Sequence, residues 1–423
     1  MNVIELLKKL IAINSINPFT TVTSEDGKVY GIGNEEKILD FIEPLLVDGG
    51  FSCKRQIVQE HCIISVDGKA VSVPKRTNLL CEKGSGNSSI LFSGHVDTVE
   101  VKSGWTEQEA LTPMEKVVGG KRRIYGLGSN DMLAGIAVMI RSALDAEIPG
   151  GRKLKLAFLC DEEFWSIGVN ALCGSSFLDD VEVIFVPEIG ESDLSTPVDK
   201  KTVCLGRMGR CEFEFTVPGT GGHGAVSRKN GLVNAATDAA KLVLALESYA
   251  YQIEKTFTFG DEPWEKITNS AFVNRIDAGM GGLSIPDHAK VIFDRSFVPG
   301  EKIANELVLL QGLVDALYVN GTFKEVSGEK ISVRERYRPT PASDAYVVSK
   351  ESNWVKKIQT VINRGIVFTM GNSVADENVY ARTVKVPVIV IGPIGEDCHS
   401  AHEWVDIGSV EELYEIYKKI IMC

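Results

Sequence analysis

SSILFSGHVDTV, residues 88–99, joins a short apolar run to a histidine and an aspartate that follow it directly. The run at 88–93 carries no charged residue, which is typical of a strand that is buried on both faces of a sheet. In open α/β sheets, ligands bind outside the carboxyl ends of the strands. The segment therefore predicts a buried strand that brings His95 and Asp97 to a ligand site.

Further runs that are mostly apolar occur at 153–160, 181–186 and 386–392. Residues 132–148 carry apolar side chains at three- and four-residue spacing, which predicts a helix. This alternation of strands and helices is typical of an α/β fold whose mostly parallel sheet has helices on both faces. Near the end of the chain, Ser409 and Glu412 have the pattern of a capping box, which predicts that a final helix starts at Ser409.

The middle of the chain follows a different order of elements. It has a predicted strand at 211–217, a helix at 234–249, strands at 271–277 and 288–294, a helix at 302–318 and a strand at 330–335. A βαββαβ order is ferredoxin-like, and such a unit is self-sufficient and can be inserted into another domain. We predict a discontinuous α/β domain at 1–206 and 338–423, with an inserted α+β domain at 207–337.

The composition excludes several classes of partner. Lys and Arg number 45 against 57 Asp and Glu, which gives a net charge of −12 without any basic cluster. Such a surface repels nucleic acid and anionic lipid, and no stretch approaches the ~18 apolar residues of a membrane span. The start of the chain lacks the features of a signal peptide, and the nine cysteines form no CxxC pair. We therefore predict a cytoplasmic protein whose cysteines are small core residues.

Side chains that could bind a metal follow the predicted strands. They are His95, Asp131, the carboxylates 161–163, Glu188 and His399. Taken singly, each has an ordinary interpretation as a turn residue, a helix cap or a solvated charge. Adjacent carboxylates directly after a buried strand repel one another, however, and a bound cation would relieve that repulsion. Histidine and carboxylate together suit zinc and related ions, so the set predicts a metal site.

The motifs around these residues resemble those of a known enzyme family. They are SGHVDTV (93–99), GLGSNDMLAG (126–135), DEE (161–163), GGHGA (221–225), DRSFVPGE (294–301) and CHSAHE (398–403). The family is that of the di-zinc amidohydrolases, which include acetylornithine deacetylase, succinyl-diaminopimelate desuccinylase, aminoacylase and several dipeptidases and carboxypeptidases. The resemblance runs nearly from end to end, and the motif at 93–99 is the most specific.

The resemblance implies two divalent metal ions, with zinc expected and cobalt or manganese as alternatives. One ion would be bound by His95 and Glu188, the other by Glu163 and His399, and Asp131 would bridge both. The residues beside Glu188 depart from the family's Gly-Glu-Pro, which leaves Glu191 as an alternative. The family places its last histidine four residues before a glutamate, here Glu403, which selects His399 rather than His402.

The resemblance also implies residues that act on the substrate. Glu162 would be the general base, because a carboxylate that is not bound to metal must take the proton of the attacking water and pass it to the leaving nitrogen. Asp97 would orient the metal ligands. The inserted domain would be a lid through which a homodimer forms. Its His223 would polarise the scissile carbonyl, either within one chain or from a partner subunit.

The sequence therefore predicts a hydrolase that cuts the amide bond of an N-acyl amino acid. A dipeptidase or carboxypeptidase that acts on short peptides is an alternative, because no motif identifies the residues that line the substrate pocket. A catalytically inactive relative that only binds an amino-acid derivative is another. Arg295 could hold a substrate carboxylate, although a structural pair with Asp294 or Glu301 is the favoured interpretation.

Overall fold

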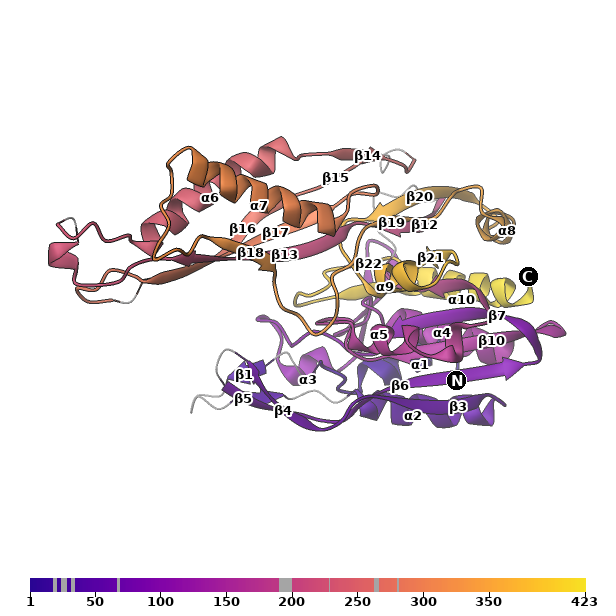
Figure 1. Ribbon diagram of the computed structural model, residues 1–423. Coiled ribbons are helices and arrows are strands. Elements are labelled where there is room, and N and C mark those ends of the chain that lie inside the picture. Colours follow the sequence, from indigo (N-terminus) through magenta and orange to yellow (C-terminus); the bar gives the residue numbers. More distant parts are fainter. Residues whose placement is uncertain are drawn as a thin grey trace.

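The computed structural model has an α/β body and a second unit in which helices lie over a separate sheet (Figure 1). It describes residues 1–17, 21–23, 29–31, 35–66, 69–189, 200–227, 229–261, 266–279 and 281–423. Both termini lie in the α/β body. Within the described ranges, no helix combines the length and the apolar character needed to cross a membrane.

The α/β body is built on a nine-stranded sheet of order β19-β12-β21-β11-β7-β10-β6-β3, in which β20 also pairs with β12. Its strands are β3 (Ser52–Gln59), β6 (Arg76–Gly84), β7 (Gly86–His95), β10 (Gly151–Leu159), β11 (Val181–Val186), β12 (Lys200–Arg207), β19 (Tyr346–Val347), β20 (Gly365–Gly371) and β21 (Val388–Val390). The central strands β21, β11, β7 and β10 are parallel, whereas β6, β3 and β19 run antiparallel to their neighbours. The predicted α/β class is confirmed, and the sheet is mixed rather than mostly parallel.

A tight connection explains why the sheet becomes antiparallel at β6. Ser85 alone separates β6 from β7, yet β10 lies between these two strands in the sheet. A connection of one residue is too short for the crossover that parallel neighbours require. Gly86, at φ 148°, permits the close passage, because a side chain there would collide with the backbone carbonyl of Gly151.

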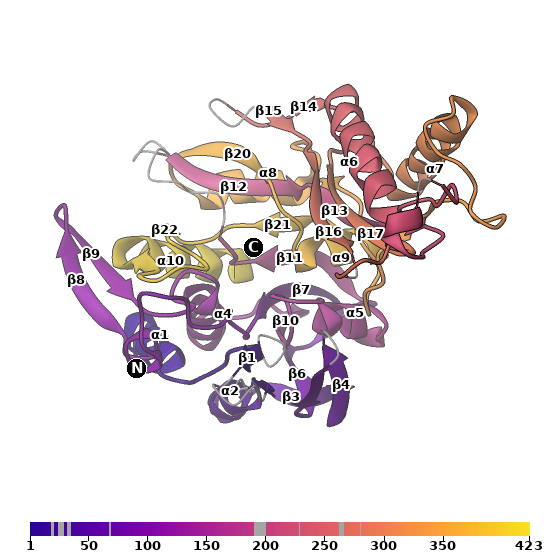
Figure 2. The same cartoon turned by 90° about the vertical axis from the view of Figure 1, so that its left-hand side faces the viewer.

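Helices cover both faces of the sheet. Helices α1 (Val3–Ile11), α4 (Leu133–Asp145) and α10 (Ile407–Met422) pack on one another, and α5 (Ile167–Cys173) packs against α9 (Asp376–Thr383) on the other side (Figure 2). The remaining helices of the body are α2 (Glu36–Asp48), α3 (Glu107–Ala110) and α8 (Asn353–Val361). Helix α4 is buried along most of its length, so the main hydrophobic core lies between these helices and the sheet.

The predicted start of the last helix is wrong by two residues. Helix α10 begins at Ile407, and the carboxylate of Asp406 accepts the Ser409 N–H at 2.8 Å as its N-cap. The Ser409 hydroxyl instead accepts the N–H of Ile394 at 2.8 Å. Aspartate and serine are equally good N-caps, so the sequence pattern could not separate the two positions.

The second unit has the predicted ferredoxin-like arrangement. Its sheet of order β16-β17-β13-β18 is antiparallel throughout. Its elements are β13 (Gly209–Pro218), α6 (Ala235–Gln252), β16 (Ala271–Ala278), β17 (His288–Phe297), α7 (Ile303–Val319) and β18 (Ser332–Glu335), with an unpredicted hairpin of β14 (Thr256–Thr258) and β15 (Lys266–Thr268). Both long helices cover one face over a separate core (Figure 1). The domain boundaries at 207 and 337 stay a prediction.

A small sheet ties two distant loops together beside the body. Its order is β22-β23-β9-β8, formed by β8 (Met114–Val118), β9 (Lys121–Tyr125), β22 (Gly395–Glu396) and β23 (Trp404–Asp406). The loop after β9 leads to Asp131, and the loop between β22 and β23 contains His399. The remaining short strands are β1 (Thr21–Thr23), β2 (Val29–Gly31), β4 (Cys62–Val66) and β5 (Lys69–Val73).

Two cysteines are paired, contrary to the sequence interpretation. Cys53 of β3 and Cys81 of β6 lie directly opposite each other in the sheet and form a disulfide. The prediction that all cysteines are simple core residues is therefore wrong for this pair. Twenty-eight residues separate the two, so only the strand register brings them together.

Candidate metal centre and active site

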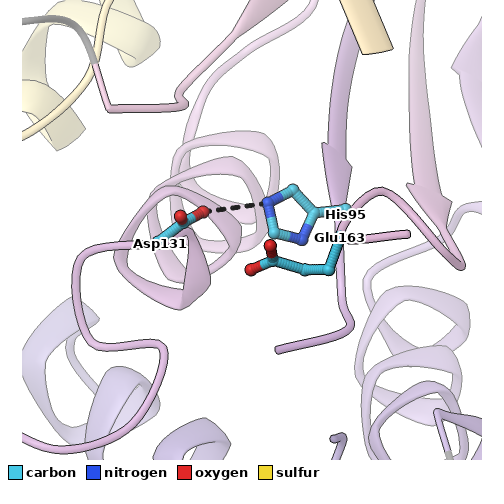
Figure 3. A group of neighbouring side chains, drawn as sticks. All are labelled: His95, Asp131 and Glu163. Carbon is cyan, nitrogen blue, oxygen red and sulfur yellow. Dashed lines mark hydrogen bonds and ion pairs between the residues drawn. The ribbon is translucent and has the colours of Figure 1, made fainter. Parts of the chain in front are cut away.

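His95 is the last residue of β7, and its buried ring is held in one orientation. Its Nδ1 lies 2.9 Å from the backbone carbonyl oxygen of Asp97 and donates to it. Its Nε2 therefore faces the other members of a cluster that consists of His95, Asp131, Glu163, Glu188 and His399, and it lies 3.1 Å from Asp131 Oδ1 and 3.3 Å from Glu188 Oε2. Figure 3 shows the His95 ring beside Asp131 and Glu163.

Asp131 lies between two histidines. One carboxylate oxygen faces His95 Nε2, and the other lies 3.1 Å from His399 Nε2. Glu163 Oε2 lies 3.0 Å from the same nitrogen of His399. The candidate ligand atoms of His95, Asp131 and Glu163 all lie within 4.8 Å of one another. The structure thus brings together residues that follow different strands of the sheet.

Two further carboxylates brace the loops that carry the cluster. Asp97 accepts the backbone N–H groups of Glu162 and Glu163, each at 3.1 Å, and the side-chain amide of Asn17 at 2.8 Å. Glu403 accepts the backbone N–H groups of Gly128, Asn130 and Asp131 at 2.8, 2.8 and 2.9 Å. Backbone donors are fixed by the fold, so these bonds set where Glu162, Glu163 and Asp131 project.

A buried ion-pair network lies behind the 161–163 turn. Arg76 Nε donates to Glu35 at 2.7 Å, and its Nη1 donates to Asp161 at 2.9 Å. All three side chains are fully buried, and Asp161 has a positive φ of 69°. The sequence predicted no role for Arg76, Glu35 or Asn17, because a buried charge and a surface charge look alike in a single sequence.

The crowded carboxylates of the cluster favour the binding of a cation. Burial, followed by the charge of Asp131, raises the pKa of Glu163 to about 7 and also raises the pKa of Glu188. Hydrogen bonds to Asp131 and Glu163 raise the pKa of His399 to about 11. Glu163 Oε1 is buried without a hydrogen-bond partner in the described part of the chain. An excess of crowded carboxylate charge and an unsatisfied ligand atom fit a divalent-metal site.

Other predicted residues take the following places. His399 faces Asp131 and Glu163, whereas His402 is exposed and its Nδ1 accepts the Trp105 indole N–H at 3.0 Å. Glu188 joins the cluster, and its alternative Glu191 lies outside the described residues.

Arg295 has the structural role that the sequence favoured. It is buried, and its Nη2 lies 2.9 Å from Glu301 while its Nε lies 3.5 Å from Glu306. Asp294 pairs with Arg210 at 2.9 Å instead. The guanidinium group of Arg295 is therefore already paired within the protein and is not available to bind a substrate carboxylate.

His223 forms no hydrogen bond or ion pair with the cluster among the described residues. It is exposed, and its Nδ1 accepts the N–H of Ala225 at 3.2 Å. Asn234 caps α6, so His223 is not the cap of that helix. Figure 1 shows that the segment between β13 and α6 lies at the end of the second unit that is remote from the α/β body.

A cavity of about 1030 Å³ opens over the cluster. Its floor is formed by Asp131, Glu162, Glu163, Glu188 and His399. The lining also includes four arginines, Arg210, Arg275, Arg336 and Arg338, which we call the arginine wall. Asp376 and Glu377 at the start of α9 lie beside the cavity, and Glu377 pairs with Arg207 at 3.1 Å. Sequence reasoning missed the arginine wall and α9, because no motif marked them.

Comparison with known proteins gives matches along nearly the whole chain. Residues 91–422 match the peptidase family M20/M25/M40. The chain is 31% identical to succinyl-diaminopimelate desuccinylase from Sphingopyxis alaskensis, over 99% of this chain and 97% of that one. Its fold is similar to that of a tripeptidase from Staphylococcus aureus (16% identity, TM-score 0.69, coverage 100% and 98%). It is also similar to that of a dinuclear metal binding peptidase from Bacillus subtilis (13% identity, TM-score 0.63, coverage 99% and 96%).

Proposed function

This chain belongs to the peptidase family M20/M25/M40 and is a hydrolase of linear amide bonds, and we propose that its substrate is an N-acyl amino acid. The relative with 31% identity is by name a desuccinylase of succinyl-diaminopimelate, which supports an acylated amino acid. Small acyl amino acids and short peptides both fit a cavity of about 1030 Å³.

The observation that carries the proposal is the position of Asp131 between two histidines. We assign His95 and Glu188 to one ion, Glu163 and His399 to the other, and Asp131 to both. The donor set of imidazole and carboxylate suits zinc, with cobalt and manganese as alternatives. When bound, two such ions would polarise the amide carbonyl and lower the pKa of the attacking water.

Glu162 is the general base in this proposal. Its carboxylate lines the cavity, and its backbone N–H is held by Asp97 at 3.1 Å. Burial raises the pKa of Glu162 well above its usual range. A carboxylate with a raised pKa can accept the proton of water as the water oxygen bonds to the carbonyl carbon. It can then donate that proton to the leaving nitrogen as the C–N bond breaks, which gives the acid and the free amine.

We also propose a homodimer that forms through the second unit and supplies His223 to the neighbouring cavity. Strand β16 is an edge strand, and its Phe272 and Ile276 are exposed. Leu244 of α6 and Val308 of α7 are exposed on the same unit. Exposed apolar side chains on an edge strand and its covering helices favour association. From a partner, His223 could donate to the carbonyl oxygen as it gains charge.

The alternatives differ in substrate and in activity. The second candidate is a peptidase that acts on short peptides, because a tripeptidase has a similar fold. A protein that only binds amino-acid derivatives is disfavoured, because the candidate metal ligands lie together and Glu162, the proposed general base, lines the same cavity. The cytoplasmic location stays a prediction.

Metal analysis and a substrate screen test the proposal together. We expect about two divalent ions per chain in gently purified protein. A chelator should abolish hydrolysis, and Zn²⁺, Co²⁺ or Mn²⁺ should restore it. N-acetyl and N-succinyl amino acids should be cut faster than dipeptides. Full activity of metal-free protein would contradict the assignment of the cluster, and a clear preference for dipeptides would favour the second candidate.

A further inference from the structure

Two aromatic residues directly follow the proposed general base and the metal ligand beside it. Phe164 and Trp165 come after Glu162 and Glu163 in the sequence, and all four residues line the same cavity. The two rings contact each other edge to face, with their centroids 4.8 Å apart. Phe164 is 38% exposed. An aromatic pair that lines a cavity offers a surface that an apolar part of a ligand can cover.

Hydrogen bonds fix the turn that carries this aromatic pair. The Ser166 N–H donates to the backbone carbonyl of Asp161 at 2.6 Å, which closes the turn over residues 161–166. The Thr340 hydroxyl donates to the backbone carbonyl of Trp165 and ties the turn to the segment that leads back from β18. The turn that carries the general base therefore also holds the aromatic pair beside it.

Two further segments extend the apolar lining next to the pair. Pro341 follows Thr340, whose hydrogen bond places it beside Trp165, and Pro341 also lines the cavity. Arg382 of α9 donates to the backbone carbonyl of Pro341 at 3.3 Å. Val379, one turn away on the same helix, is a further lining residue. We call these four side chains the apolar patch: Phe164, Trp165, Pro341 and Val379.

The apolar patch and the floor favour different parts of a substrate. The floor offers charged and polar groups to the amide bond. The patch consists of apolar side chains, so a charged group placed on it would lose its hydration without gaining a partner there. An apolar group gains instead by leaving water, and a phenyl ring can also meet the aromatic pair edge to face.

We propose that the apolar patch binds an aromatic or large aliphatic group of the substrate while the amide bond lies on the floor. The inference rests on the proposed function for the reaction and adds the substrate class, which is an acyl amino acid or short peptide with a bulky apolar group. Because the aromatic pair follows Glu162 within three residues, this group lies next to the scissile bond. It could be the acyl chain or the side chain of the amino acid.

Three compounds separate these two sources. N-acetylphenylalanine and N-phenylacetylalanine each add one phenyl ring to N-acetylalanine, the first on the amino-acid side chain and the second on the acyl group. We expect the wild type to cut at least one phenyl compound with a kcat/KM about 10- to 100-fold above that of N-acetylalanine, mainly through KM. Phe164→Ala should reduce this preference by about 10-fold, and Phe164→Leu should keep more of it, because leucine is still a large apolar residue.

Tyr251→Ala is the matched control. Tyr251 lies on α6, is 75% exposed and is not part of the cavity lining, so loss of its ring should leave the preference unchanged. A wild type that cuts all three compounds equally well would overturn the inference, and so would a preference that survives in Phe164→Ala. If Phe164→Ala loses a metal ion, Trp165→Ala decides in its place, and an unchanged preference there would have the same meaning.

Calorimetry of the same three compounds on metal-loaded protein separates this inference from the proposed function. If the wild type hydrolyses none of them, the proposed function fails, and binding then decides the role of the apolar patch. Tighter binding of a phenyl compound that is lost in Phe164→Ala supports the role. Equal binding of all three compounds to the wild type refutes it.

Discussion

The floor of the cavity and the arginine wall both carry many charges, but they hold them differently. On the floor, the carboxylates of Glu163 and Asp131 lie against His399. The loops that carry these two residues are fixed, because their backbone N–H groups donate hydrogen bonds to Asp97 and Glu403. On the wall, the arginines are mostly exposed and neutralised by nearby carboxylates, with Arg338 as the exception.

This difference indicates a division of roles. The floor concentrates negative charge, which bound cations would stabilise. The wall is nearly balanced, and screened surface pairs of this kind contribute little stability. We therefore expect variants of the floor to change metal content and turnover, and variants of the second unit to change substrate recognition or cooperation between subunits.

Loss of a floor ligand should have the largest effect. Glu163→Gln replaces a charged ligand by a weak one and removes the partner that lies 3.0 Å from His399. We expect the variant to lose one of the two ions and nearly all activity. Elemental analysis with circular dichroism measures this, and Glu415→Gln, an exposed residue of α10, is the control. If the variant kept both ions and full activity, Glu163 would not be a metal ligand, and the proposed difference in role between the floor and the arginine wall would be wrong.

Glu162→Gln sharpens the comparison within the floor itself. Its carboxylate is assigned to proton transfer rather than to metal binding, so both ions and substrate affinity should be kept. Turnover should fall by a factor on the order of 10² or more, the scale of lost general-base catalysis. Metal content, KM and kcat measured on one preparation decide this. Loss of an ion in Glu162→Gln but not in Glu163→Gln would mean that the two roles are exchanged.

His223→Ala tests whether the second unit acts across a dimer. We expect kcat to fall more than substrate affinity, by about 10- to 100-fold, because the side chain would act on the developing oxyanion. If a partner supplies His223, mixing this variant with Glu162→Gln should restore part of the activity through hybrid dimers. Mixed dimers that exchange subunits but recover no activity would contradict the role across the dimer.

The sequence predicted the floor better than its surroundings, for a physical reason. Glu163 and Glu188 follow β10 and β11, and the neighbouring His95 is the last residue of β7. Because the carboxyl ends of parallel strands meet at one edge of the sheet, local patterns were enough to predict that these side chains lie together. The predicted strand at 181–186 matches β11 at both ends. Arg338 carries no such local signal, because its lack of a partner depends on where distant residues of the fold lie.

The supporting contacts behind the site could not be predicted from the sequence alone. The Arg76 network joins residues of three separate segments, and the Cys53–Cys81 disulfide depends on the pairing register of β3 and β6. Register is set by the tertiary pairing of the strands, which a single sequence does not reveal.

His402→Ala should have the smallest effect, although His402 is only three residues from His399. Its ring is exposed and accepts one hydrogen bond from Trp105 at 3.0 Å, without any described contact to the cluster. Loss of one such bond costs about 1 kcal/mol, so both ions should stay bound and any change should appear in KM. His399→Ala, by contrast, removes the partner of both Asp131 and Glu163 and should release an ion. Metal analysis of the two purified variants compares them directly, and an ion lost only from His402→Ala would reverse the assignment of these histidines.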